Sequence, residues 1–282
     1  MSKDEAVPAA TAEQGGSRNL VMRVLAALVL APLAIAIAYA GGWPWALLVT
    51  LASIGLFVEW LMIMGAARDT RVLAAGIAAL VLAALYLAVG RTDAALVILA
   101  IGLVGVALPP GRRNWTATGF AYAAIALVAS VLVRSDQSHG FAALMLVLLV
   151  VWVTDIGGYF AGRGIGGPKL WPRVSPKKTW AGAIGGFAAS LVVAAGFAAL
   201  GLGQTGPLLL LGALLSVASQ LGDLFESAVK RRFGVKDSSQ IIPGHGGLMD
   251  RLDGYVAAIV LAAVFGLLRG GVDGVGRGLM VW

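Results

Sequence analysis

Residues 206–229 read GPLLLLGALLSVASQLGDLFESAV, an apolar run with two carboxylates, Asp223 and Glu226, in its second half. The run is long enough for a helix to cross the hydrocarbon core of a bilayer, which takes about 20 residues. A carboxylate near hydrocarbon costs about 2.5–3.5 kcal/mol, so such residues are rare and mark functional sites. The stretch therefore predicts a membrane-spanning helix that carries chemistry near one end.

The whole chain has this apolar character. Hydrophobic residues make up 59% of its 282 residues and charged residues only 12%, and its mean hydropathy is +0.89. These values are typical of an all-α, polytopic integral membrane protein. We expect a flexible cytoplasmic N-terminal segment, residues 1–19, and a single transmembrane domain, residues 20–282. The sequence contains no cysteine, which excludes disulfides, thiolate nucleophiles and cysteine metal sites.

Nine apolar segments are candidate spans, and their number places the two ends of the chain on opposite sides of the membrane. They are residues 20–40, 43–64, 71–89, 93–108, 116–133, 140–160, 179–202, 206–229 and 254–269. Of the 21 Lys and Arg, 17 then fall on the side of the N-terminus; the other side has Arg91, Arg134, Arg269 and Arg277. The positive-inside rule therefore puts the N-terminus and both long polar connections, 161–178 and 230–253, in the cytoplasm.

Carboxylates from three of these segments are expected at the same cytoplasmic depth. They are Asp155 of the sixth span, Asp223 and Glu226 of the eighth, and Asp250 and Asp253 at the start of the ninth. Oxygen ligands from several helices suit Mg²⁺, which keeps positions free for water and substrate phosphates. We expect Asp223 and Asp250 to be the principal metal ligands, with the other three supporting them or binding a second cation. The alternative is that each carboxylate pairs with a nearby Lys or Arg.

Cations and glycines surround these carboxylates. Asp223, Glu226, Ser227 and Lys230 follow one another at i, i+3, i+4 and i+7, so they share one helix face. The density of donors fits a polyphosphate; the candidates are Lys177, Lys178, Lys230, Arg231, Lys236 and Arg251. Gly246 and Gly247 allow backbone amides to approach phosphate oxygens, or they only make the turn into the last helix. Ser227 and His245 are expected to support the site by hydrogen bonding.

One further carboxylate, Glu59, lies near the cytoplasmic end of the second span, next to Trp60. Two interpretations remain open from the sequence. A buried glutamate there would line the polar site, whereas an interfacial one would lie at the membrane surface beside a Trp anchor.

The polar segment resembles the C-terminal signature of the phosphatidate cytidylyltransferase family, also called CDP-diacylglycerol synthases. The matching residues are Ser227, Lys230-Arg231, Lys236-Asp237, His245-Gly246-Gly247, Asp250-Arg251 and Asp253. Asp155–Arg163 and Val174–Trp180 are similar to the family's other cytoplasmic motif, and the resemblance is strong over about residues 150–265. It implies Mg²⁺-dependent transfer of CMP from CTP to phosphatidic acid, with Asp223, Ser227, Lys230, His245, Asp250, Arg251 and Asp253 as the catalytic set.

The resemblance also implies a location, which is the bacterial cytoplasmic (inner) membrane. Membrane lipids and a second copy of the chain, as a homodimer, are candidate partners; nucleic acid is not, because the net charge of +7 reflects topology and anionic lipid. Two other functions stay open: a CTP-dependent enzyme acting on another membrane lipid, and an ion-coupled transporter of a phosphorylated solute. A transporter is expected to have polar residues at mid-membrane in both halves, whereas here they gather at one face of the second half.

Overall fold

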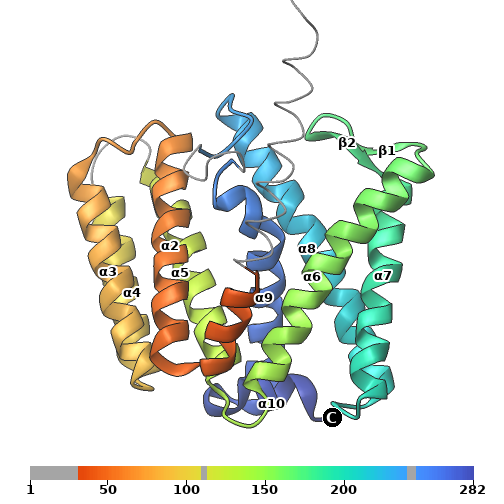
Figure 1. Cartoon of the computed structure of the whole chain (residues 1–282). Coiled ribbons are helices and arrows are strands. Elements are labelled where there is room, and N and C mark those ends of the chain that lie inside the picture. Colours follow the sequence, from red (N-terminus) through yellow and green to blue (C-terminus); the bar gives the residue numbers. More distant parts are fainter. Residues whose placement is uncertain (1–30, 109–112, 240–245) are drawn as a thin grey trace, which may run out of the picture.

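The computed structural model describes residues 31–108, 113–239 and 246–282, and shows a bundle of long helices (Figure 1). The bundle starts with a short helix over Ala31–Ala40. The elements that follow it are α2 (Gly42–Ile63), α3 (Thr70–Ala88), α4 (Thr92–Ala107), α5 (Arg113–Ser135), α6 (Gly140–Gly164), β1 (Lys169–Trp171), β2 (Ser175–Thr179), α7 (Trp180–Ala199), α8 (Thr205–Arg232), α9 (Met249–Gly270), the 3₁₀ turn Val272–Gly274 and α10 (Val275–Met280).

The helical, polytopic membrane architecture is confirmed. Within the described ranges, seven helices are long and apolar enough to cross a bilayer: α2, α3, α5, α6, α7, α8 and α9. Segment 93–108 is α4, a helix of 16 residues, and the described part of segment 20–40 is Ala31–Ala40. The predicted N-terminal segment 1–19 lies outside the described residues.

The polar connections are more ordered than the sequence analysis expected. Helix α6 continues to Gly164, α8 continues to Arg232, and α9 already begins at Met249. Residues 169–179 form an antiparallel hairpin of β1 and β2, in which Lys169 pairs with Thr179. The hairpin was not predicted, because two prolines and the short strands hide any alternation of apolar residues. Thr179 ends it and caps α7 by accepting a 3.1 Å hydrogen bond from the Gly182 amide.

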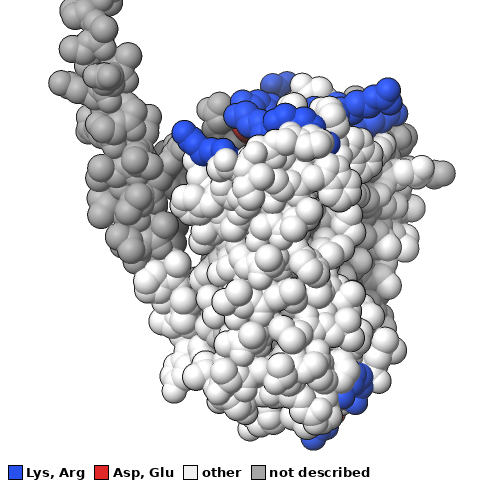
Figure 2. Space-filling model, turned by 90° about the vertical axis from the view of Figure 1, so that its right-hand side faces the viewer, with Lys and Arg blue, Asp and Glu red and all other residues white. Residues whose placement is uncertain are grey.

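Helix α9 is the centre of the bundle. It packs against α2 and α5 on one side and against α6 and α8 on the other (Figure 1). Most Lys and Arg visible in Figure 2 gather at the end of the molecule that carries the hairpin; a few lie at the opposite end, and the long wall between shows neither charge. Most of the basic side chains in this view are therefore presented at one end of an apolar cylinder.

Glycines bring α6 and α7 into close contact. A Cβ atom at Gly186 would lie 2.5 Å from the Thr154 carbonyl oxygen, and one at Gly182 would lie 2.8 Å from the Gly158 carbonyl oxygen. Small residues let helix backbones approach in the membrane, where dispersion contacts stabilise helix pairs. These glycines of α7 are thus packing residues.

Asp136 organises the opposite end of the bundle. Its carboxylate accepts hydrogen bonds from the amides of Ser138 (3.0 Å) and His139 (2.9 Å) in its own loop, and from the amide of Arg277 in α10 (2.7 Å). Burial alone would raise the pKa of Asp136, but the hydrogen bonds from these amides outweigh it and lower the pKa. The carboxylate therefore ties the α5–α6 loop to the C-terminal helix.

Candidate functional site

Three helices bring four carboxylates together at the basic end of the bundle. Asp155 comes from α6, Asp223 and Glu226 from α8, and Asp253 from α9. The charges of Asp155, Asp223 and Asp253 act on one another, and the Glu226 and Asp253 carboxyl groups are direct neighbours. The structure therefore places these four predicted site residues in one cluster.

Lysines neutralise part of this negative charge. Lys178, at the end of the hairpin, forms an ion pair with Asp223 and so joins the first polar connection to α8. Lys230 lies between two carboxylates: its Nζ is 3.3 Å from Glu226 Oε2 and 2.5 Å from Asp250 Oδ1. The alternative that each carboxylate pairs with a nearby lysine thus holds for Asp223, Glu226 and Asp250. Within the described ranges, Asp155 and Asp253 form no ion pair.

Glu226 is the carboxylate whose surroundings are least complete. The residue is fully buried (0% exposed). Lys230 is its ion-pair partner at Oε2, but within the described residues no hydrogen bond reaches either oxygen. The hydroxyl of Tyr122, on α5, is also buried without a partner there. Buried polar atoms without partners are costly, and they are found where a ligand, ion or water completes the site. Adjacent carboxylates of Glu226 and Asp253 offer the oxygen ligands that Mg²⁺ prefers.

The protein groups alone do not enclose a metal. Within the described residues, no three Asp, Glu or His side chains lie close enough together to hold an ion. Mg²⁺ is commonly held by one or two carboxylates, with substrate phosphates and water at its other positions. One or two carboxylates of this group would be enough for such a Mg²⁺ site. Which of them bind the metal stays a prediction.

Asp250 differs from the other predicted metal ligands, because protein donors already surround its carboxylate. It accepts hydrogen bonds from the amides of Ser238 (3.1 Å) and Gly247 (3.0 Å), in addition to the contact with Lys230. The Ser238 hydroxyl lies 3.0 Å from the same carboxylate. A carboxylate has about four acceptor positions, so few remain for a metal. Asp250 is therefore better placed to hold the loop than to bind an ion.

Most of the predicted phosphate-binding cations are exposed at the same end. Lys177, Arg231, Lys236 and Arg251 are exposed, whereas Lys178 and Lys230 are partly buried. Ser227 is hydrogen-bonded to Asp223 at 3.4 Å, on the helix face that its spacing predicts. Gly246 and Gly247 lie next to Asp250 at the start of α9. His245 lies outside the described residues.

Residues that the sequence analysis missed or left open complete the site. Glu59 and Trp60 are both fully buried (0% exposed), so the interfacial interpretation of this pair is wrong. Glu59 instead contacts the loop before α9, through Ser238 and Ser239. Tyr122 lies against Trp60 and within electrostatic reach of Glu226. For Glu59 the sequence did offer a signal, because a carboxylate inside an apolar run is unusual. For Ser238 and Ser239 it offered none, since serines are common in polar loops.

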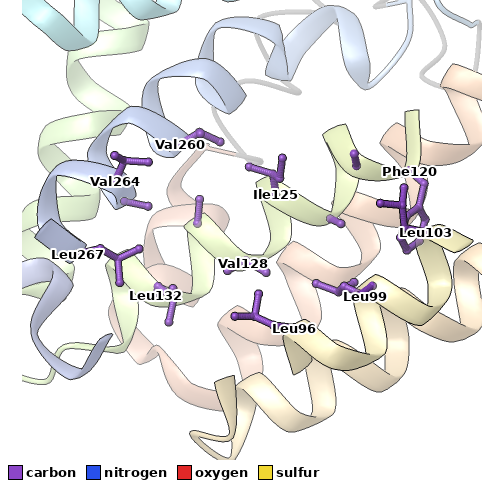
Figure 3. A pocket seen from close by; sticks show the side chains of 15 residues that line it. Leu96, Leu99, Leu103, Phe120, Ile125, Val128, Leu132, Val260, Val264 and Leu267 are labelled. Carbon is purple, nitrogen blue, oxygen red and sulfur yellow. The ribbon is translucent and has the colours of Figure 1, made fainter. Parts of the chain in front are cut away.

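A cavity of about 320 Å³ lies elsewhere, between α4, α5 and α9 (Figure 3). Its walls are apolar side chains such as Leu99, Phe120, Val128 and Val264. No side chain that lines it can donate or accept a proton, so the chemistry belongs to the polar end of the bundle and not to this cavity.

The comparisons with known proteins agree with this geometry. The model of a cytidylyltransferase family matches residues 21–268. A protein of Brucella suis named phosphatidate cytidylyltransferase is 40% identical over 259 residues, which cover 89% of this chain and 94% of that protein. Proteins of the same name from Haemophilus influenzae and Bacillus subtilis are 46% and 45% identical over 46% and 44% of this chain, and over 47% of each relative. The chain belongs to the cytidylyltransferase family.

Proposed function

We propose that the protein is a phosphatidate cytidylyltransferase, which transfers CMP from CTP to phosphatidate and releases pyrophosphate. The observation that carries the proposal is the meeting of carboxylates from α6, α8 and α9, of which Glu226 is fully buried, with cationic loops at one end of an apolar bundle. That end offers charge complementary to a metal and a triphosphate, next to hydrocarbon that suits a lipid. The names of the relatives point to the same reaction.

Positioning and charge stabilisation are sufficient for this reaction. A phosphatidate oxygen attacks the α-phosphorus of CTP, and the bond to the β-phosphate oxygen breaks. Phosphatidate is already anionic near neutral pH, so its oxygen needs alignment more than deprotonation. Lys230, Arg231, Lys236 and Arg251 would hold the phosphates and stabilise the departing pyrophosphate.

Glu226 and Asp253, with Asp155 and Asp223 beside them, are the residues that would hold Mg²⁺. Within the described residues no hydrogen bond reaches the Glu226 oxygens, whereas amides already occupy the Asp250 carboxylate, and this supports Glu226 over Asp250. A bound Mg²⁺ supplies charge stabilisation to the phosphate oxygens during transfer. The protein's own part is to keep Lys178 and Lys230 at the edge of the cluster, where they limit repulsion between neighbouring acids.

We propose that the protein lies in the inner membrane with nine spans. Its site then opens on the cytoplasmic side. CTP is a cytosolic solute, and phosphatidate stays in the bilayer because each methylene group exposed to water costs about 0.8 kcal/mol. The basic end in Figure 2 supports this orientation through the positive-inside rule. Asp155 is exposed on α6, so a head group that arrives sideways from the bilayer would meet the cluster there.

A panel of acceptors tests the proposal. Purified protein is given CTP labelled in its α-phosphate, with phosphatidate, a polyprenyl phosphate or an archaeal ether-lipid phosphate in separate micelles. We expect label in lipid with phosphatidate and at least tenfold less with the others. Preferential labelling of another acceptor would assign the enzyme to that lipid instead.

A further inference from the structure

Glu59 accepts four hydrogen bonds from residues 238–239 and 248–249, although it belongs to α2, far from the polar segment in sequence. Its carboxylate oxygen Oε1 accepts from the Leu248 amide and the Ser239 hydroxyl, each at 2.7 Å. Oxygen Oε2 accepts from the Met249 amide and the Ser238 hydroxyl, each at 2.8 Å. Each oxygen therefore accepts two hydrogen bonds, and together they hold residues 238–239 and 248–249.

Two of these contacts cap a helix. Leu248 is the N-cap residue of α9 and Met249 is its first residue, and the leucine has no side-chain oxygen to offer. The first amides of a helix lack partners within it, and negative charge is favourable at this end of the helix dipole. Glu59 supplies both the acceptor and the charge, so the cap of α9 comes from another helix.

Residues 247–248 also lie so close to α2 that there is no room for a Cβ atom at Gly247 or at Gly55. A Cβ atom at Gly247 would be 2.6 Å from Glu59 Oε2, and a Cβ atom at Gly55 would be 2.6 Å from a methyl carbon of Leu248. On its other side the loop is held by Asp250, which accepts from the amides of Ser238 and Gly247. Glu59 and Asp250 thus fix residues 238–239 and 247–249 from two directions.

We propose that Glu59 is a positioning residue for CMP transfer. It touches no reacting atom; it holds the loop so that the cations on either side, Lys236 and Arg251, and the amides of Gly246 and Gly247 meet the triphosphate. The inference rests on the proposed function, because these cations matter to catalysis only if they bind the phosphates of CTP.

Glu59→Gln is the sharpest test, because the two side chains have the same shape. Each carboxylate oxygen accepts one backbone N–H, so the amide group of glutamine faces a backbone N–H whichever way it turns. A buried donor left against another donor loses its partner outright. We expect kcat/KM for CTP to fall roughly 10- to 100-fold, with a higher KM for CTP, while the KM for phosphatidate stays within about twofold.

Thr50→Val is the matched control on the same helix. Thr50 is also buried, and among the described residues its hydroxyl bonds only the Ala46 carbonyl of α2. This variant should keep the parent's KM for both substrates. Equal kinetics for Glu59→Gln and the parent would overturn the inference, as would an equal loss in Thr50→Val.

A thiol probe reports the loop without any substrate. The chain has no cysteine, so Leu248→Cys places a single thiol where the loop meets Gly55, and Ala143→Cys places one in the buried part of α6. With Glu59→Gln added, we expect faster labelling at position 248 and unchanged, slow labelling at 143. Equal acceleration at both would mean general unfolding and would contradict a positioning role. A parent protein that transfers no CMP would refute the proposed function alone, since labelling at 248 needs no CTP.

Discussion

The substitution Lys230→Met removes the ammonium group that lies between Glu226 and Asp250. The lysine side chain is 12% exposed, and those of the two acids are 1% and 14% exposed, so little water replaces the lost cation. Asp250 keeps its contacts with the Ser238 and Gly247 amides. Glu226 keeps no hydrogen-bond donor within the described residues, and Asp253 lies beside it.

The loss of stability expected for Lys230→Met comes mainly from Glu226, because within the described residues Asp250 keeps its other donors and Glu226 does not. Removing one partner of a buried ion pair costs about 3–5 kcal/mol, because the remaining charge is left uncompensated. For a chain of this size, 1 kcal/mol corresponds to roughly 2–4 °C in the unfolding midpoint, so Lys230→Met should unfold roughly 6–20 °C below the parent. Adding Glu226→Gln removes the stranded charge and should recover about 1–3 kcal/mol as coupling energy.

Thermal unfolding in detergent, followed by loss of monodisperse protein, measures all variants under one condition. Lys177→Met is the matched control: Lys177 is an exposed lysine of β2, and its loss should change stability by no more than about 0.5 kcal/mol. The reasoning is refuted if Lys230→Met is as stable as Lys177→Met, or if adding Glu226→Gln lowers stability further.

Three other predictions concern metal binding, helix packing and pH. Asp253→Asn should abolish turnover at any Mg²⁺ concentration while the protein stays folded in detergent. The control Asp93→Asn, at the exposed Arg91–Asp93 pair, should keep parental activity. Normal Mg²⁺-dependent rates in Asp253→Asn would contradict the proposed metal site. Gly186→Ala should cost about 1–3 kcal/mol in thermal unfolding, because its Cβ meets the Thr154 carbonyl. Gly196→Ala adds a Cβ that meets no other described element within 4 Å, so it should be neutral or stabilising by up to about 1 kcal/mol; equal effects would refute the close packing of α6 and α7. The lowered pKa of Asp136 adds stability that is present above its ordinary value, near pH 4, and lost as pH falls through the lowered value. The stability difference between the parent and Asp136→Asn should therefore shrink as the pH falls below about 4, and a difference that stays constant over the acid range would count against it.

Local spacing was a good guide within single helices. Positions 223, 226, 227 and 230 were predicted to share a face of α8, and the contacts of Ser227 with Asp223 and of Lys230 with Glu226 confirm it. Such contacts follow from the 3.6-residue period alone. The apolar runs likewise predicted the long helices, since a bilayer leaves the backbone few other solutions.

Contacts between distant segments could not be predicted in this way. The pair of Lys178 with Asp223 depends on a hairpin whose strands are short and interrupted by proline. The hydrogen bonds of Glu59 join positions about 190 residues apart, so no periodicity connects them. The sequence neighbours of Asp250 likewise do not reveal the serine and glycine amides that surround its carboxylate.

We propose above that the polar end of the bundle catalyses CMP transfer to a lipid phosphate. The most direct measurement compares two labels in one assay, with purified protein, phosphatidate, Mg²⁺ and CTP labelled in either the α- or the γ-phosphate. We expect lipid labelled from α-labelled CTP only, with the γ-label recovered as pyrophosphate, and no labelled lipid from Asp253→Asn. Lipid labelled from γ-labelled CTP, or α-label transferred equally well by Asp253→Asn, would contradict it.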